Sequence, residues 1–361
     1  MKRQSGLFPQ ICDRQTLAVS AARAALGKRH RAEVRTFFAG YHEQICEIGT
    51  SIGNGTFAFS DYRQFPVRDP KSRIIHAPAF QDRVVHHAII HITGRVFEMG
   101  ALEHSFACRR GKGQHAALNR ASQWIHAGDW FFKADIRKFY DSVDHDVLRL
   151  LLRRRFREER LLELFNRLLD SYSHEPGKGL PIGALTSQHL GNFYLDPVDS
   201  WAKQTMSVRR YLRYMDDMLF IGTRSELQKV QHEIGPFLES YGLSVKGLGQ
   251  LNRCELGVPY LGFTLYPNRV RLNSQGRKRV RKRTRQLERS FEKGLISESE
   301  LQQRVGSMFA HAQFSDDVRW RRTLCANTLL RGSQEPGVAW RVVQEHGQQV
   351  PLGVSQQEQG R

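Results

Sequence analysis

The stretch VRRYLRYMDDMLFIG, residues 208–222, has apolar and aromatic runs on either side of the acidic pair Asp216 and Asp217. This pattern predicts a strand, a tight turn at Met215-Asp216-Asp217 and a second strand. Adjacent carboxylates at a hairpin tip repel each other, and a divalent cation bound between them would remove that repulsion. The alternative is an ordinary acidic turn, because aspartate is common in turns.

A third carboxylate favours the cation. The segment DWFFKADI, residues 129–136, is an apolar run that ends on an acid, as expected for a buried strand that delivers Asp135 at its end. An unpaired charge at that place would be costly. Carboxylates from two strands can hold two hard cations about 3.5–4 Å apart. One cation would activate the 3′-hydroxyl of a primer, and the other would steady the triphosphate and the leaving pyrophosphate. The three aspartates therefore predict two-metal nucleotidyl transfer.

Length and charge agree with a nucleic-acid partner. The chain has 361 residues, which predicts two or three lobes, and its 40% hydrophobic content excludes global disorder. Lys and Arg number 55 against 36 Asp and Glu, so the formal net charge is +19. Clustered cations release counterions from a phosphate backbone, and a polyanion is therefore the expected partner. A membrane surface is the competing interpretation.

Other features exclude several classes of protein. The sequence has no run of about 18 apolar residues and no secretory signal at its start, so we expect no membrane partner. Its five cysteines are scattered without a CxxC motif, which predicts neither a zinc site nor a disulfide framework and fits a cytoplasmic location. His86, His87 and His91 lie in a predicted helix over residues 82–100. They are interpreted as packing or surface residues, because no Cys or Glu stands at ligand spacing.

An aromatic pair near Asp135 predicts a sugar pocket. Tyr140 follows that aspartate by five residues and is placed to stack under the sugar and reject a 2′-hydroxyl. The alternative is that Phe139 and Tyr140 belong to the core. One of them is expected there, because neighbours in an extended segment face opposite ways.

A glycine-containing loop predicts the base-pair side of the same pocket. Gly183, in Pro181-Ile182-Gly183, lets the backbone approach a base pair closely and precedes a helix predicted over residues 184–204. Ser187 and Gln188 lie on the first turns of that helix. They are expected to contact template or nucleotide, with a helix cap and a solvated polar face as the alternative.

Basic segments predict contacts with phosphates. Lys71 and Arg73 lie on a predicted hairpin over residues 61–80, which would fold over the triphosphate and neutralise developing charge, or else form a solvated turn around Asp69-Pro70-Lys71-Ser72. The segment RRGKG, residues 109–113, lacks P-loop spacing. We interpret it as a flexible basic loop that brings Arg110 and Lys112 near template phosphates.

The run RKRVRKRTR, residues 277–285, has seven basic residues in nine. A nuclear-localisation signal and a disordered tail are alternatives, but helical periodicity continues to about Leu330, which favours a helix face on phosphates. The side chains expected there are Arg277, Lys278, Arg281, Lys282 and Arg285.

Together the motifs resemble those of a reverse transcriptase. ADIRKFYDSVDH (134–145) resembles the first catalytic block, and GLPIGALTSQHLGNFYLD (179–196) resembles the block that contacts template and nucleotide. YMDD (214–217) is the catalytic turn of that superfamily, and GVPYLGF (257–263) resembles the primer-grip hairpin. The resemblance covers about residues 60–330.

A narrower resemblance rests on the segment Ile182 to Gln188. Most reverse transcriptases carry QGxxxSP there, whereas this chain has IGxxxSQ, which is similar to the enzymes of diversity-generating retroelements. The stretches VRDPKSRII (67–75), DRVVHHA (82–88) and FACRRGKGQHAAL (106–118) are also similar to that family. The resemblance implies error-prone cDNA synthesis opposite adenine, on a template RNA, with a small oligomeric accessory protein.

The resemblance also implies roles for individual residues. Asp135, Asp216 and Asp217, with Ile136, would form the site for two Mg²⁺ ions, for which Mn²⁺ would substitute. Lys71 and Arg73 would meet the triphosphate of a dNTP, and Tyr140 would gate the sugar. A lysine that protonates pyrophosphate is expected, and Lys246 is the nearest candidate. Primer and template contacts would come from Tyr214, Tyr260, Leu261 and Gly262.

The expected fold is an α+β right-hand polymerase with fingers, an antiparallel-sheet palm and a helical thumb. Expected boundaries are an N-terminal extension (1–60), fingers (61–128), palm with fingers elements (129–270), thumb (271–332) and a poorly ordered tail (333–361). The expected function is RNA-directed DNA synthesis in a diversity-generating retroelement. One alternative is a retron, antiviral-defence or group II intron-like enzyme, and another is an inactive polymerase-like RNA-binding scaffold.

Overall fold

The computed structural model describes residues 3–68 and 72–329. Contacts between residues divide the chain into two compact units. The first unit combines Met1–Ala117 with Asp129–Asn252, and the second combines Leu118–Gly128 with Arg253–Arg361. The expected domain boundaries are a different division, and they stay predictions.

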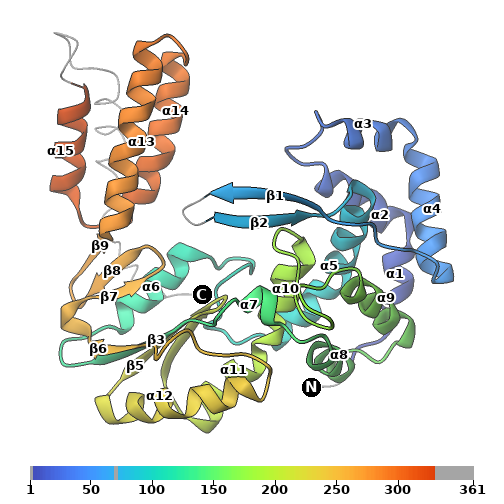
Figure 1. Ribbon diagram of the computed structural model, residues 1–361, viewed down its shortest axis with the longest axis horizontal. Helices are drawn as coiled ribbons and strands as arrows, with labels where there is room; N and C mark the ends of the chain where they lie inside the picture. Colours follow the sequence, from blue (N-terminus) through green and yellow to red (C-terminus); the bar gives the residue numbers. More distant parts are fainter. Residues whose placement is uncertain (1–2, 69–71, 330–361) are drawn as a thin grey trace, which may run out of the picture. The chain divides into compact units, whose positions relative to one another are not determined.

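A four-stranded sheet forms the centre of the first unit, in the order β4-β5-β3-β6 (Figure 1). Its strands are β3 (Trp130–Ala134), β4 (Arg210–Tyr214), β5 (Asp217–Gly222) and β6 (Gln250–Arg253). β5 pairs antiparallel with both β3 and β4. Phe131 and Phe132 point to opposite faces of β3, and both are buried, so the sheet is covered on both sides. Helix α12 (Arg224–Glu239) packs on β3 and β5.

A separate two-stranded hairpin precedes the sheet. β1 (Arg63–Arg68) pairs antiparallel with β2 (Ser72–Ala77), as the sequence predicted. Most of the hairpin is exposed, and Phe65, Val67 and Ile74 keep over a third of their surface in solvent. The turn that contains Lys71 lies outside the described residues.

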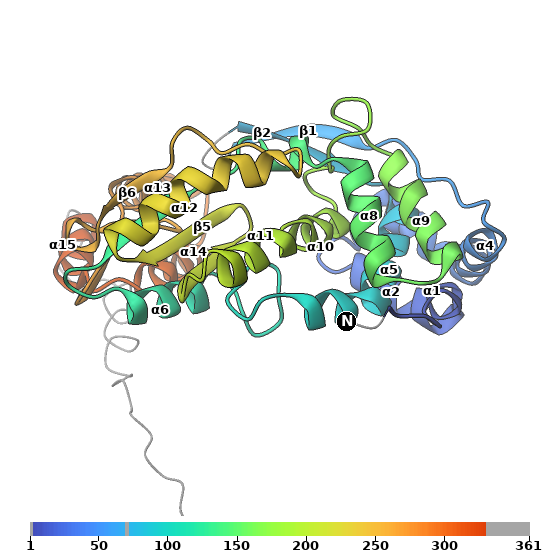
Figure 2. The same ribbon diagram turned by 90° about the horizontal axis from the view of Figure 1, so that it is seen from below.

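Helices make up the rest of the first unit. α5 packs against α2 and α10, and α8 lies beside α9, as Figure 2 shows. These helices are α1 (Phe8–Cys12), α2 (Arg14–Ala24), α3 (Ala32–Ala39), α4 (Tyr41–Asn54), α5 (Phe80–Gly100), α7 (Phe139–Ser142), α8 (His145–Arg155), α9 (Glu159–Asp170), α10 (Leu185–Tyr194), α11 (Asp196–Ser200) and the π-helix η1 (Trp201–Thr205). Helix α6 (Gln114–Trp124) begins in this unit and continues into the second.

In its described residues, the second unit contains a three-stranded antiparallel sheet, the end of α6, a 3₁₀-helix and three further α-helices. Its core includes Phe263, Val280, Leu287 and Phe309. The elements are the 3₁₀-helix η2 (Cys254–Leu256), β7 (Val258–Tyr260), β8 (Phe263–Tyr266), β9 (Arg269–Leu272), α13 (Ser274–Glu292), α14 (Glu298–Ala312) and α15 (Val318–Leu329).

The α+β class and the antiparallel acid-bearing sheet are confirmed, but two local predictions are wrong. Residues 139–140 are not extended, because α7 begins there, and Phe139 alone of the pair is fully buried. The helix expected over residues 184–204 is three successive elements, α10, α11 and η1. Pro197 explains the break after α10, because proline has no N–H to donate and suits the first turn of a new helix.

Two further predictions concern the C-terminal tail and membrane-spanning helices. The tail over residues 333–361 lies outside the described residues. Within residues 3–68 and 72–329, no helix combines the length and the apolar character needed to span a bilayer.

Of the three histidines of α5 that were predicted to lie in packing or at the surface, His86 is a packing residue and His91 is exposed. His86 is completely buried, and its Nδ1 lies 2.9 Å from Oγ1 of Thr186 on α10. Burial, with a smaller effect of His87 and Arg83, lowers the pKa of His86 to about 3. His91 lies 2.8 Å from a guanidinium nitrogen of Arg23. The histidines therefore join α5 to α10 and α2.

We predict that His86 makes folding stability depend on pH. Below pH 6.5 the unfolded chain protonates this histidine and the folded chain does not, so its contribution is lost as the pH falls from about 6.5 to about 3. The expected slope is ~1.4 kcal/mol per pH unit. Urea unfolding at pH 7.5 and 4.5 should show wild type losing more stability than His86→Gln. A change at the exposed His232, His232→Gln, is the control, and equal losses in wild type and His86→Gln would contradict the assignment.

Candidate active site

The strand register brings the three predicted aspartates to one end of the sheet. Tyr214 pairs with Asp217, which leaves Met215 and Asp216 as a two-residue turn, so Asp217 is the first residue of β5 and not part of the turn. Ala134 pairs with Met218. One further step along that register sets Asp135 opposite Asp217. We use the name acidic turn for residues 214–217, which are the two-residue turn and the strand residue on each side of it.

Two lysines hold the outer carboxylates. Nζ of Lys246 donates to Oδ2 of Asp135 at 3.0 Å, and Nζ of Lys133 lies 2.9 Å from Oδ1 of Asp217. About a third of each aspartate side chain is exposed, 35% for Asp135 and 31% for Asp217. Sequence reasoning missed Lys133, although a lysine inside the apolar run FFKADI was a signal for a nearby carboxylate.

Asp216 lies between these two carboxylates. Burial raises its pKa to about 7, and the charges of Asp135 and Asp217 and a hydrogen bond to Asp135 add to the shift. A cation at this place would favour the ionised form of Asp216 by offsetting both effects. Without a cation, Asp216 is therefore only partly ionised near neutral pH.

The donor set fits hard divalent cations. Three carboxylates from neighbouring strands offer oxygen ligands of the kind that Mg²⁺ and Mn²⁺ prefer. With Asp135 and Asp217 turned to their lysines, no three His, Cys, Asp or Glu side chains of the described residues are already arranged around one point. A cation would therefore compete with the two ammonium groups for the carboxylates. Ile136 follows Asp135 directly, and its side chain is buried.

Backbone hydrogen bonds fix Lys246 beside Asp135. The N–H of Lys246 donates to the carbonyl of Asp135 at 2.8 Å, and Ile136 forms a bridge with Val245. The contact with Asp135 raises the pKa of Lys246, first through the hydrogen bond and then through the charge of that carboxylate. Lys246 is thus a protonated group that the fold brings to the three acids.

Tyr140 lies next to the acidic turn. Burial raises its pKa, Cys108 and Asp216 raise it further, and Arg73 of β2 lowers it. These interactions place the ring near an aspartate of the turn and near the hairpin. Helix α10 approaches closely at Gly191, where an added Cβ would lie 3.1 Å from the Phe139 ring.

The predicted loop contacts the hairpin directly. The N–H of His76 donates to the carbonyl of Ile182 at 2.7 Å. Gly183 has φ +118°, and an added Cβ would lie 2.6 Å from Cγ2 of Ile75. Only glycine fits here, because both the backbone angle and the space exclude a side chain. The loop 181–183 and β2 therefore form one surface.

Ser187 and Gln188 have different surroundings. Ser187 is buried, and its hydroxyl has no hydrogen-bond partner within the described part of the chain. Gln188 is exposed, and its Oε1 accepts a hydrogen bond from Sγ of Cys108 at 3.4 Å. Cys108, which sequence reasoning missed, has φ 53°. It lies near Tyr140 and Tyr214 and contributes to the raised pKa of each. Contact of Gln188 with a nucleotide stays a prediction, and burial favours packing for Ser187.

The basic loop is more ordered than predicted. Arg109, which was expected in a flexible segment, binds Glu98 at 2.6 Å. Nζ of Lys112 donates to the carbonyl of Glu103 at 2.7 Å and lies over the Phe106 ring. Arg110 is exposed. Phosphate contacts of Arg110 and Lys112 stay predictions.

The remaining predicted residues lie in the second unit. Leu261 and Gly262, both with positive φ, form the tight turn between β7 and β8, and Tyr260 beside them is buried. Arg277 binds the buried Asp317 at 2.6 Å, which gives it a structural role. The other basic residues line an open groove along α13: Lys278, Arg281, Lys282 and Arg285.

Comparisons with known proteins agree on a family. The family model described as reverse transcriptase (RNA-dependent DNA polymerase) matches residues 66–265. The group II intron-encoded protein LtrA of Lactococcus lactis is 25% identical, over 45% of this chain and 28% of its own length. Protein YkfC of Escherichia coli is 22% identical, over 61% of this chain and 66% of its own length.

Two further matches complete the comparison. The COX1/OXI3 intron 1 protein of Saccharomyces cerevisiae is 20% identical, over 61% of this chain and 34% of its own length. The chain thus spans about a third of the length of the first curated relatives that it matches. The solved structure of apo telomerase from Candida tropicalis has a TM-score of 0.46 and 13% identity, over 81% of this chain and 67% of that chain.

We predict that Gly183→Ala separates the loop from the hairpin. The new Cβ would meet Ile75 at 2.6 Å, so the variant should lose ~1–3 kcal/mol of unfolding free energy. Gly177→Ala is the matched control, because Gly177 also has positive φ but no atom within 4 Å of an added Cβ. Urea unfolding measures both. Equal losses in the two variants would show that the close approach at residue 183 has no energetic weight.

Proposed function

The chain belongs to the reverse transcriptase (RNA-dependent DNA polymerase) family, and we propose on that premise that it copies a template RNA into cDNA by two-metal nucleotidyl transfer. The observation that carries the proposal is the meeting of Asp135 with the acidic turn at one end of the sheet. Primer, template and dNTPs are the proposed substrates. An acidic site in a chain of net charge +19 suits a polyanion that needs metal ions at the reacting phosphate.

Two Mg²⁺ ions, or Mn²⁺ in their place, would supply an activated 3′-hydroxyl and neutralise charge on the triphosphate. Asp135, Asp216 and Asp217 would hold them, and Ile136 would complete the site through its backbone. Lys246 would donate a proton to the leaving pyrophosphate, since its ammonium group already lies 3.0 Å from Asp135.

Neighbouring residues would form the nucleotide pocket. Tyr140, close to Asp216, would stack under the sugar and reject a 2′-hydroxyl. Arg73 of the hairpin, with Lys71, would meet the triphosphate. The loop at Ile182 and Gly183 would face the nascent base pair. Primer and template contacts are proposed for Tyr214, for the turn at 260–262 and for the groove along α13.

Primer extension on an RNA template with Mg²⁺ tests the activity. Wild type should extend a DNA primer, and Asp216→Ala/Asp217→Ala should reduce extension to background, because the metal ions lose two carboxylates. Asp146→Asn is the control, because this aspartate is exposed on α8, outside the site. Extension that survives the double change refutes the site. No extension by wild type under any metal would favour the alternative of an inactive RNA-binding scaffold.

We further propose a diversity-generating retroelement as the biological setting. The support is the IGxxxSQ pattern at 182–188. A glutamine at position 182 could hydrogen-bond around a nascent pair and penalise mispairs, which an isoleucine cannot do. A small oligomeric accessory protein is the proposed partner. An intron-type reverse transcriptase is the second candidate, because the similar proteins include the group II intron-encoded protein LtrA and a COX1/OXI3 intron 1 protein.

The error spectrum separates the two candidates. Sequencing of cDNA made by wild type should show errors concentrated opposite template adenines, and Ile182→Gln should reduce them, because the glutamine restores a polar check on the pair. Ile182→Val is the matched control and should retain the errors. Adenine errors that are absent in wild type favour the intron-type candidate. Adenine errors unchanged in Ile182→Gln remove the proposed role of Ile182.

A further inference from the structure

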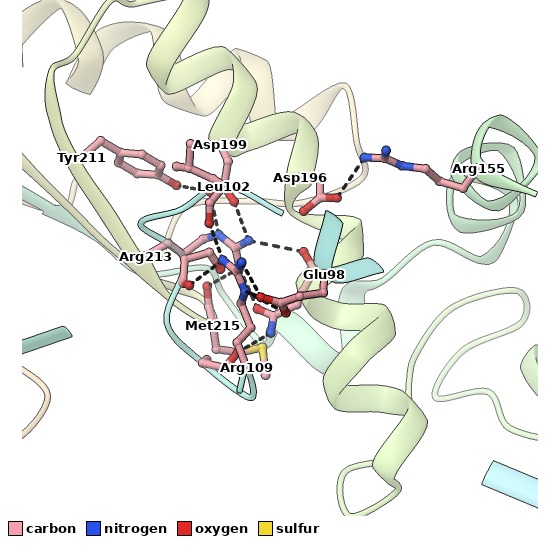
Figure 3. Close-up of polar contacts among 12 residues, drawn as sticks. Glu98, Leu102, Arg109, Arg155, Asp196, Asp199, Tyr211, Arg213 and Met215 are labelled. Atoms are coloured by element: carbon pink, nitrogen blue, oxygen red, sulfur yellow. Dashed lines mark hydrogen bonds and ion pairs between the residues drawn. The ribbon is translucent and has the colours of Figure 1, made fainter. Parts of the chain in front are cut away.

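Arg213 stands one residue before the acidic turn and is completely buried, with 0% of its side chain exposed. Its guanidinium group binds both carboxylate oxygens of Asp199 on α11, with Nε to Oδ1 at 2.7 Å and Nη2 to Oδ2 at 2.6 Å (Figure 3). The third nitrogen, Nη1, donates to Oδ1 of Asn192 at 3.0 Å and to the carbonyl of Met215 at 3.2 Å. One side chain thus joins two helices to the turn.

The contact with Met215 reaches the backbone that carries Asp216. A carbonyl and the following N–H lie in one rigid plane, so a donor that fixes the Met215 carbonyl orients the start of Asp216. Met215 has φ 54°, a conformation that residues other than glycine adopt only when their surroundings hold them there. Arg213 provides such a hold from inside the protein.

Asp199 is fixed in turn. The hydroxyl of Tyr211 donates to its Oδ1 at 2.7 Å, from the same face of β4 as Arg213. Figure 3 shows two further ion pairs around this point, Arg155 with Asp196 at 3.4 Å and Arg109 with Glu98 at 2.6 Å. Three arginines thus face three acidic side chains, and we call these six residues the arginine cluster.

The arginine cluster also touches the wall of the nucleotide pocket. The N–H of Arg213 donates to the carbonyl of His104 at 3.0 Å, and its carbonyl accepts from the N–H of Phe106 at 2.9 Å. Nδ2 of Asn192 donates to the carbonyl of Ala107 at 2.7 Å, next to Cys108. The backbone of Arg213 and the side chain of Asn192 therefore link the segment before Cys108 to the acidic turn.

We propose that Arg213, oriented by Asp199, is a positioning residue that holds the acidic turn in the geometry needed for metal binding and turnover. The proposal rests on the proposed polymerase function. A merely structural ion pair would affect stability alone. A positioning residue also affects metal binding and kcat.

The test uses the full-length chain and the double change Arg213→Met/Asp199→Asn. This variant leaves no buried charge unpaired and retains an acceptor for Tyr211, so it should fold. In primer extension we expect kcat to fall about 10- to 100-fold, because small displacements of reacting groups have effects of that size. KM for dNTP should change less than about twofold, since no group that contacts the dNTP is altered. Mn²⁺ binding, followed by electron paramagnetic resonance without substrate, should weaken.

Two further variants complete the design. Arg210→Gln/Asp129→Asn removes an ion pair at the other end of β4, 2.5 Å in length, and should leave kcat and Mn²⁺ binding unchanged. Arg213→Lys retains the charge beside Asp199 but cannot bind Asp199 and Met215 together as a planar fork does. It should melt close to wild type and still lose kcat and Mn²⁺ affinity.

The outcomes are distinct. A folded double variant with wild-type kcat and Mn²⁺ binding overturns the positioning role, while wild-type extension leaves the proposed function standing. If the double variant does not fold, kcat and Mn²⁺ binding of Arg213→Lys decide instead. A loss of both supports the positioning role, and wild-type values overturn it. If wild type makes no DNA, the proposed function fails, and Mn²⁺ binding by wild type and Arg213→Lys still tests whether Arg213 holds the turn.

Discussion

A buried bidentate ion pair between Arg213 and Asp199 anchors the end of the sheet on which the candidate active site is built. Loss of one partner of such a pair leaves an unpaired buried charge and costs about 3–5 kcal/mol. Burial alone would lower the pKa of Arg213, but the charge and hydrogen bonds of Asp199 outweigh it and raise that pKa. Arg213 therefore stays protonated, and the turn beside it is tied to the protein interior.

The site combines this rigid support with repulsion among its own acids. Asp135 and Asp217 are each neutralised by a lysine, while Asp216 is left between them with a pKa of about 7. Such an arrangement is unfavourable without a cation and is stabilised by one. The fold thus concentrates negative charge at one place in a protein whose overall charge attracts nucleic acid. An acidic site in a basic protein is what a nucleic-acid polymerase of the reverse transcriptase family would need.

Much of this arrangement could be predicted from the sequence. Apolar and aromatic runs on either side of Asp216 and Asp217, and the run that ends on Asp135, predict the strands and the antiparallel hairpin at the acids. Local pattern could not predict which distant groups would meet the acids. Lys133 and Cys108 reach the site through strand register and loop packing, which single stretches of sequence do not encode, whereas Lys246 was expected there from the family resemblance. The break of the expected helix had a local signal in Pro197, whereas the helical turn at Phe139, which is buried in the core, had no signal that we recognised.

Direct observation of the metal ions tests the central claim. Crystals of the protein with an RNA template, a DNA primer and a non-reactive dNTP analogue, grown in Mn²⁺, would reveal manganese by anomalous scattering. The account predicts two manganese peaks about 3.5–4 Å apart, in contact with Asp135, Asp216 and Asp217. Manganese bound elsewhere, or an Asp135 side chain turned away from the acidic turn in that complex, would contradict it.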